Sequence, residues 1–113
     1  MRPTIIWIAL AIGLSACSVD SDVSRTLGAR CDRLDDCDER CLADAEDYPG
    51  GFCSVSCMAD RDCPDGASCV DKDGGVCLFD CVSDADCEFL DIGWQCSAKD
   101  ALPDGEEMVC IGD

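Results

Sequence analysis

Thirteen cysteines in 113 residues constrain this chain more than any other feature, and twelve of them follow a repeating pattern. Each group of four opens with two cysteines separated by five residues, and each later group begins four residues after the previous one ends. Such repetition is typical of a chain built from like units. We therefore expect one cysteine-rich domain over residues 31–113, with units at about 31–56, 57–80 and 81–113. The groups are Cys31, Cys37, Cys41 and Cys53; Cys57, Cys63, Cys69 and Cys77; and Cys81, Cys87, Cys96 and Cys110.

The residues between the cysteines indicate turns rather than long helices or strands. Asp60 and Asp84 stand where an Asx side chain caps a short helical turn that leads to the second cysteine of the unit. Glycine pairs at 50–51 and 74–75 precede the last cysteine of the first two units, and glycine supplies the positive φ angles of tight turns. The predicted fold is a small disulfide-rich domain of three tandem four-cysteine units, with short β-ribbons, single helical turns and little regular secondary structure.

The cysteines are expected to form structural disulfides. Twelve is an even number, so six bridges leave no free thiol within the domain. Zinc sites use closely spaced cysteine or histidine ligands, but the sequence has no histidine and no two cysteines separated by two residues. The same absence removes the dithiol motif of thioredoxin-like enzymes. We expect no metal ligand, and a domain that unfolds when its bridges are reduced.

The N-terminus carries an export signal. One arginine, an apolar run over residues 5–14 and two small residues precede Cys17, and the run is too short for a membrane-spanning helix. Leu14-Ser15-Ala16-Cys17 resembles the lipobox of bacterial lipoproteins. The resemblance implies that residues 1–16 are a cleaved signal peptide and that the Cys17 thiol carries a covalent lipid. An ordinary secretory signal is the alternative.

The same resemblance bears on location. In lipoproteins, aspartate directly after the lipidated cysteine favours retention in the inner membrane, and this chain has Ser18 there. The outer membrane is therefore the expected location in a cell with two membranes. Residues 17–30 are expected to be the lipidated cysteine followed by a flexible tether, because they are polar and show no sustained apolar period.

A second resemblance concerns the disulfide pairing, which spacing alone does not determine. The stretch from Cys57 to Cys69, with Asp60, Asp62 and Cys63 inside it, is similar to part of the whey-acidic-protein, or four-disulfide-core, domains. That likeness covers about a dozen residues per unit and lacks the family's adjacent cysteine pair. It implies first-to-third and second-to-fourth pairing, while bridges between neighbouring units remain an alternative. The implied pairs are Cys31–Cys41, Cys37–Cys53, Cys57–Cys69, Cys63–Cys77, Cys81–Cys96 and Cys87–Cys110.

Charge and composition narrow the function. The chain has 25 acidic and 8 basic residues, and this excess of negative charge disfavours nucleic acid as a partner. Without histidine there is no Ser-His or Cys-His nucleophile, so we expect no catalysis and no cofactor. Acidic clusters at 60–65 and 71–73 are interpreted as turns, because neither has the full pattern of a calcium loop; weak calcium binding is the alternative.

One stretch before Cys96 is less polar than its surroundings and is the candidate binding segment. Phe89, Leu90, Ile92 and Trp94 form either an exposed contact patch or part of the small core, and we favour the core for Phe89 and Trp94 because aromatic residues are scarce. Tyr48 is expected to pack in a similar way.

The sequence as a whole predicts a cell-envelope lipoprotein that presents a disulfide-stapled module for structural or protein-binding use. Its expected partners are the membrane, through the lipid anchor, and an unidentified envelope or extracellular protein. One alternative is a protease-inhibitor-like module, with Arg61 or Lys72 as the specificity residue. Another is an adhesin.

Overall fold

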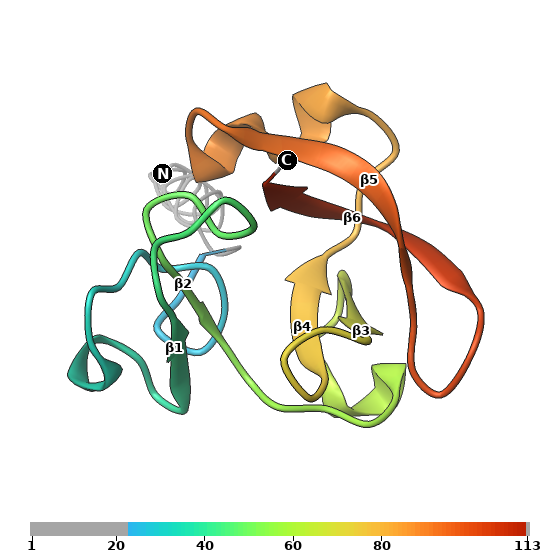
Figure 1. Ribbon diagram of the computed structural model, residues 1–113, viewed down its shortest axis with the longest axis horizontal. Helices are drawn as coiled ribbons and strands as arrows, with labels where there is room; N and C mark the ends of the chain where they lie inside the picture. Colours follow the sequence, from blue (N-terminus) through green and yellow to red (C-terminus); the bar gives the residue numbers. More distant parts are fainter. Residues whose placement is uncertain (1–22, 113) are drawn as a thin grey trace, which may run out of the picture.

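The computed structural model describes residues 23–112, which form three consecutive antiparallel hairpins. Each hairpin follows a short 3₁₀ helix, so the repeat in the sequence is also a repeat in structure (Figure 1). This arrangement confirms the predicted fold class. The elements are η3 (Leu34–Asp36), β1 (Arg40–Leu42) and β2 (Phe52–Ser54); η4 (Asp60–Asp62), β3 (Ala67–Val70) and β4 (Val76–Phe79); and η5 (Asp84–Leu90), β5 (Trp94–Asp100) and β6 (Glu106–Gly112).

Two groups of buried residues lie on opposite sides of β2. Successive side chains of a strand point to opposite faces, so Phe52 faces one group and Cys53 the other. The first group, which we call the central core, contains cysteines of the second and third units and the fully buried side chains Phe52, Val70, Val76, Leu78, Val109 and Ile111. The second group, which we call the satellite cluster, consists of Ala29, Cys31, Cys37, Cys41 and Cys53.

Aromatic rings from all three units meet in the central core. The ring centroid of Phe52 lies 5.1 Å from that of Trp94 and 6.0 Å from that of Phe79. The ring of Phe79 in turn lies 5.2 Å from that of Phe89, edge to face. The three units therefore share one core, in which aromatic pairs add to the apolar area that is buried.

Glycine is required at equivalent positions of the first two units. Gly51 and Gly75 have φ angles of 85° and 106°, a region that residues with a Cβ atom rarely adopt. A Cβ atom there would lie 2.0 Å from the carbonyl oxygen of Cys31 and 2.2 Å from that of Cys57, respectively. The predicted turn role of the glycine pairs is therefore confirmed, and the second glycine of each pair also allows the first cysteine of its unit to approach.

The prediction of a flexible tether over residues 17–30 is wrong for the C-terminal part of that stretch. Leu27 is only 3% exposed and belongs to the central core. The Gly28 N–H donates to the carbonyl oxygen of Cys53, and the Cys53 N–H donates to that of Ala29. Residues 24–30 are thus part of the domain, lying along the edge of β2. Cys17 and residues 18–22 of the predicted tether lie outside the described residues.

Candidate functional site

The main chemical feature of residues 23–112 is a frame of six disulfides. Every bridge lies within one unit and joins the first cysteine to the third or the second to the fourth, which is the pairing that the four-disulfide-core likeness implies. Their Cα–Cα distances run from 5.3 Å in Cys37–Cys53 to 5.9 Å in Cys31–Cys41. The bridges are Cys31–Cys41, Cys37–Cys53, Cys57–Cys69, Cys63–Cys77, Cys81–Cys96 and Cys87–Cys110.

The hairpins explain how two bridges fit in each unit. The third and fourth cysteines are directly opposite in the strand register, as Cys69 and Cys77 are in β3 and β4. The third cysteine bonds to the first and the fourth to the second, instead of to each other. Both bridges therefore connect the segment around the 3₁₀ helix to the hairpin. Three sulfur atoms gather within 4.8 Å in each unit, but all of them are in S–S bonds and none is a thiolate that binds metal.

Aspartates attach the start of each unit to the backbone. Asp36, Asp62 and Asp86, each directly before the second cysteine, accept hydrogen bonds from the N–H four residues earlier at 2.8–2.9 Å. Asp36 and Asp86 also accept one from the N–H three residues earlier. These backbone hydrogen bonds hold the pKa of Asp36 and of Asp86 below the usual value.

The capping role predicted for Asp60 and Asp84 is wrong. The carboxylate of Asp60 accepts a 2.9 Å hydrogen bond from the N–H of Cys69, and Asp84 accepts one of 2.9 Å from Cys96. These aspartates therefore reach across the unit to the third cysteine, a contact nine or twelve residues away. Two residues later, Asp86 is the third helical residue in a capping box with Ser83, and Asp62 accepts the N–H of Met58, the residue before the N-cap.

In the 60–65 cluster, the carboxylates of Asp60 and Asp62 already have backbone partners. Among residues 23–112, the only groups of three or more potential metal ligands whose ligand atoms lie close together are the bridged cysteines. The structure therefore offers no support for the calcium alternative.

The two candidate specificity residues of the inhibitor alternative do not lie in an extended loop. Arg61 is in the middle of the 3₁₀ helix η4. Lys72 is in the turn between β3 and β4, where its carbonyl oxygen accepts the Gly75 N–H, and its ammonium group is 2.8 Å from a carboxylate oxygen of Asp47. Neither environment presents an extended, bridge-braced segment to a protease.

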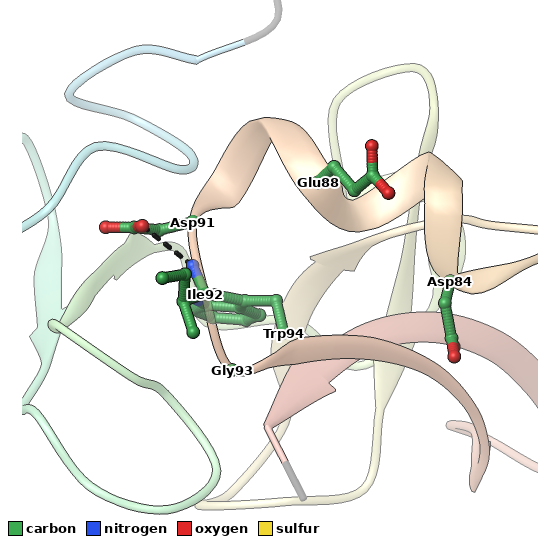
Figure 2. A pocket seen from close by; sticks show the side chains of 6 residues that line it. All are labelled: Asp84, Glu88, Asp91, Ile92, Gly93 and Trp94. Carbon is green, nitrogen blue, oxygen red and sulfur yellow. Dashed lines mark hydrogen bonds between the residues drawn. The ribbon is translucent and has the colours of Figure 1, made fainter.

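The candidate binding segment splits into buried and exposed side chains. Leu90 and Trp94 are each 7% exposed and belong to the central core, whereas Phe89 is 48% and Ile92 is 90% exposed. The core interpretation is therefore confirmed for Trp94 but is only half right for Phe89, whose ring packs on Phe79. Ile92 and Trp94 line an open depression of about 390 Å³ together with Asp84, Glu88 and Asp91, and Figure 2 shows these side chains.

Polar contacts lock the β1–β2 loop of the first unit to the other two units. Tyr48 is buried, as expected, and its hydroxyl donates a 2.6 Å hydrogen bond to Asp73 in the second unit. Burial and, secondly, this hydrogen bond raise the pKa of Tyr48 far above its usual value. The indole Nε1–H of Trp94 in the third unit donates to the carbonyl oxygen of Pro49 at 3.0 Å. These contacts hold the three units, and with them the disulfide frame, together as one body.

No family of known proteins, no curated protein and no solved structure matches this chain. Within residues 23–112 no helix is long and apolar enough to cross a membrane. The structure defines the class: a small cysteine-rich domain of three four-cysteine units, held by disulfides of the kind that persist in oxidising, extracellular compartments.

Proposed function

We propose that this chain is a bacterial cell-envelope lipoprotein, anchored by a lipid on Cys17, which presents its disulfide frame as a rigid, non-catalytic module for binding another protein. The observation that carries the proposal is the pairing of the cysteines. All twelve cysteines from Cys31 to Cys110 are bonded to one another, so Cys17 has no disulfide partner within the chain. An unpaired thiol is a liability in an oxidising compartment, and lipidation at the resembled motif uses it.

A non-catalytic role is supported by the state of the carboxylates. Among residues 23–112, the aspartates with a shifted pKa are Asp36, Asp86 and Asp91, and in each the pKa is lowered, chiefly by backbone hydrogen bonds. General acids need the opposite shift. These carboxylates have a structural task, and the sequence has no histidine to replace them.

The lipid anchor is tested by the mass of the N-terminal peptide after expression of the full chain in a bacterium. The wild type is expected to begin at Cys17 and to carry acyl chains. Cys17→Ser is expected to abolish the acyl mass, while the matched control Ser18→Ala keeps it. A wild-type peptide that is cleaved but unmodified would refute the lipid anchor and leave an ordinary secretory signal.

Location is tested separately by the residue after the anchor. Ser18→Asp is expected to move the protein from the outer-membrane fraction to the inner-membrane fraction, whereas Ser18→Ala is expected to leave it in place. Wild-type protein in the inner-membrane fraction would contradict the outer-membrane proposal without affecting the lipid anchor.

Protein binding is tested by chemical crosslinking of the lipidated chain in intact cells, followed by mass spectrometry. We expect a crosslinked envelope or extracellular protein that is lost when the disulfides are reduced first. A chain that crosslinks only to itself at native abundance would contradict the binding role. Incubation with a panel of serine proteases tests the inhibitor alternative, and we expect no stoichiometric inhibition.

A further inference from the structure

Exposed apolar side chains lie near Val23, the first residue that the structure describes. Val23 is 40% exposed and lines an open depression of about 400 Å³ together with Phe89 and Leu90. Ile92 lies on the other side of Asp91, which lines both this depression and the neighbouring one in Figure 2. We call Val23, Phe89 and Ile92 the apolar rim. Exposed apolar groups clustered in this way indicate a contact surface.

Resting on the proposed lipid anchor, we propose that the apolar rim docks on the lipid surface in which Cys17 is anchored. Only five residues lie between Cys17 and Val23, and the six Cα–Cα steps of a fully extended chain over that stretch span about 20 Å. Because residues 24–30 belong to the domain, the anchor holds the apolar rim close to the bilayer. A short linker of this kind makes docking an intramolecular step with a high effective concentration.

Charge determines which lipid surface is suitable. Removal of residues 1–16 takes away Arg2 and no acidic residue, leaving seven basic and 25 acidic residues. Among the charged residues beside the apolar rim, Asp91 is paired with Arg30, but Glu88 directly precedes Phe89 in the chain. An anionic surface repels such a domain, so the rim docks on zwitterionic lipid. Increasing the anionic lipid content is expected to lift the domain from the surface, and added salt is expected to reverse that effect.

Fluorescence of Trp94 reports the docking. Trp94 is the only tryptophan outside residues 1–16, and it lines the depression beside Ile92. The lipidated chain is placed in phosphatidylcholine vesicles that contain brominated acyl chains, and the mass of its N-terminal peptide is measured first. We expect quenching that decreases as phosphatidylglycerol replaces phosphatidylcholine.

Ile92→Ser separates docking from anchoring. Ile92 is 90% exposed, so the change leaves the fold intact but removes apolar area from the apolar rim. It is expected to lower the docking constant by about tenfold. The matched control is Met58→Ser, which removes an exposed apolar side chain of the second unit, 75% exposed, and is expected to leave the quenching unchanged.

The outcomes are distinct. A confirmed lipid mass with equal quenching in wild type, Ile92→Ser and Met58→Ser would overturn the docking while leaving the proposed function in place. Quenching that falls as more protein is loaded per vesicle would show a second copy covering the rim, and would also overturn it. A chain without lipid would overturn both proposals together.

Discussion

The disulfides of the first unit and those of the third have the same pairing but different surroundings. Cys37–Cys53 lies in the satellite cluster, where the only neighbours of its own group are Ala29 and the other bridge of the unit. Cys87–Cys110 lies in the central core, and both of its cysteines are fully buried. The Cys37–Cys53 bridge is therefore grouped mainly with other cysteines, whereas the Cys87–Cys110 bridge is grouped with apolar side chains as well.

The difference shows how a repeat of cysteines yields unequal units. Both bridges close loops of similar length, with sequence separations of 16 and 23, so they restrict the unfolded chain to a similar extent. The contribution from packing is not shared, because only Cys87–Cys110 belongs to the cluster that contains the large buried apolar side chains. The first unit gains its packing from the opposite face of β2, where Phe52 lies in the central core.

The largest expected effect comes from removing each of these bridges. The chain-entropy model assigns about 3 kcal/mol to either loop. Cys87→Ala with Cys110→Ala also leaves a cavity in the central core, so we expect a total loss of about 4–5 kcal/mol. Cys37→Ala with Cys53→Ala is the matched variant and is expected to lose about 3 kcal/mol in urea unfolding. Equal losses would show that the surroundings do not matter.

The next effect tests whether the first unit depends on the central core through one side chain. Phe52 is fully buried against rings of the second and third units, so Phe52→Ala is expected to destabilise the domain by about 3–5 kcal/mol. Phe89→Ala, at a ring that is half exposed, is the control and is expected to cost less than half as much. Urea unfolding with all six bridges intact provides the measurement. A small loss for Phe52→Ala would mean that the first unit is stable without the core.

The sequence was sufficient for features that depend on spacing and on local turns. The three units, their hairpins and the glycine positions of the first two units follow from the cysteine repeat and from Gly51 and Gly75. The role of Asp60 did not follow, because its partner is the N–H of Cys69 on a strand whose placement depends on the whole unit. Leu27 was missed because a single apolar residue in a polar stretch gives no periodic signal, although it is buried.

Acid is expected to affect the first and third units differently. Asp36 and Asp86 both have pKa values lowered in the folded state from an ordinary value of 3.8. Their stabilising effect is therefore fully present above about pH 4 and is lost as the pH falls through the lower folded values. Arg33 and Arg25 contribute to the lowering for Asp36 only. Added salt is expected to raise the pKa of Asp36 more than that of Asp86 when the carboxyl carbons are followed by NMR. Equal shifts would contradict the arginine contribution.

The smallest expected effect comes from exchanging the residues at equivalent positions of the first and second units. Leu34 occupies the place that Asp60 has in the second unit, at the start of the 3₁₀ helix, and its side chain is 62% exposed. Since Cys53 directs its N–H and C=O to residues 28 and 29, the opposite residue Cys41 points its N–H away from β2. That is the direction from which Asp60 reaches Cys69.

Leu34→Asp is therefore expected to stabilise the first unit, by about 0.5–1 kcal/mol, through a hydrogen bond to the Cys41 N–H. The reciprocal change, Asp60→Leu, removes the acceptor of the Cys69 N–H and is expected to cost about 1–2 kcal/mol. Hydrogen exchange at these two amides measures each effect locally, with Leu34→Asn as the uncharged control. If Leu34→Asp leaves the exchange of Cys41 unchanged, then the shorter segment between Cys37 and Cys41 holds that N–H out of reach, and the first unit is not a copy of the second at this position.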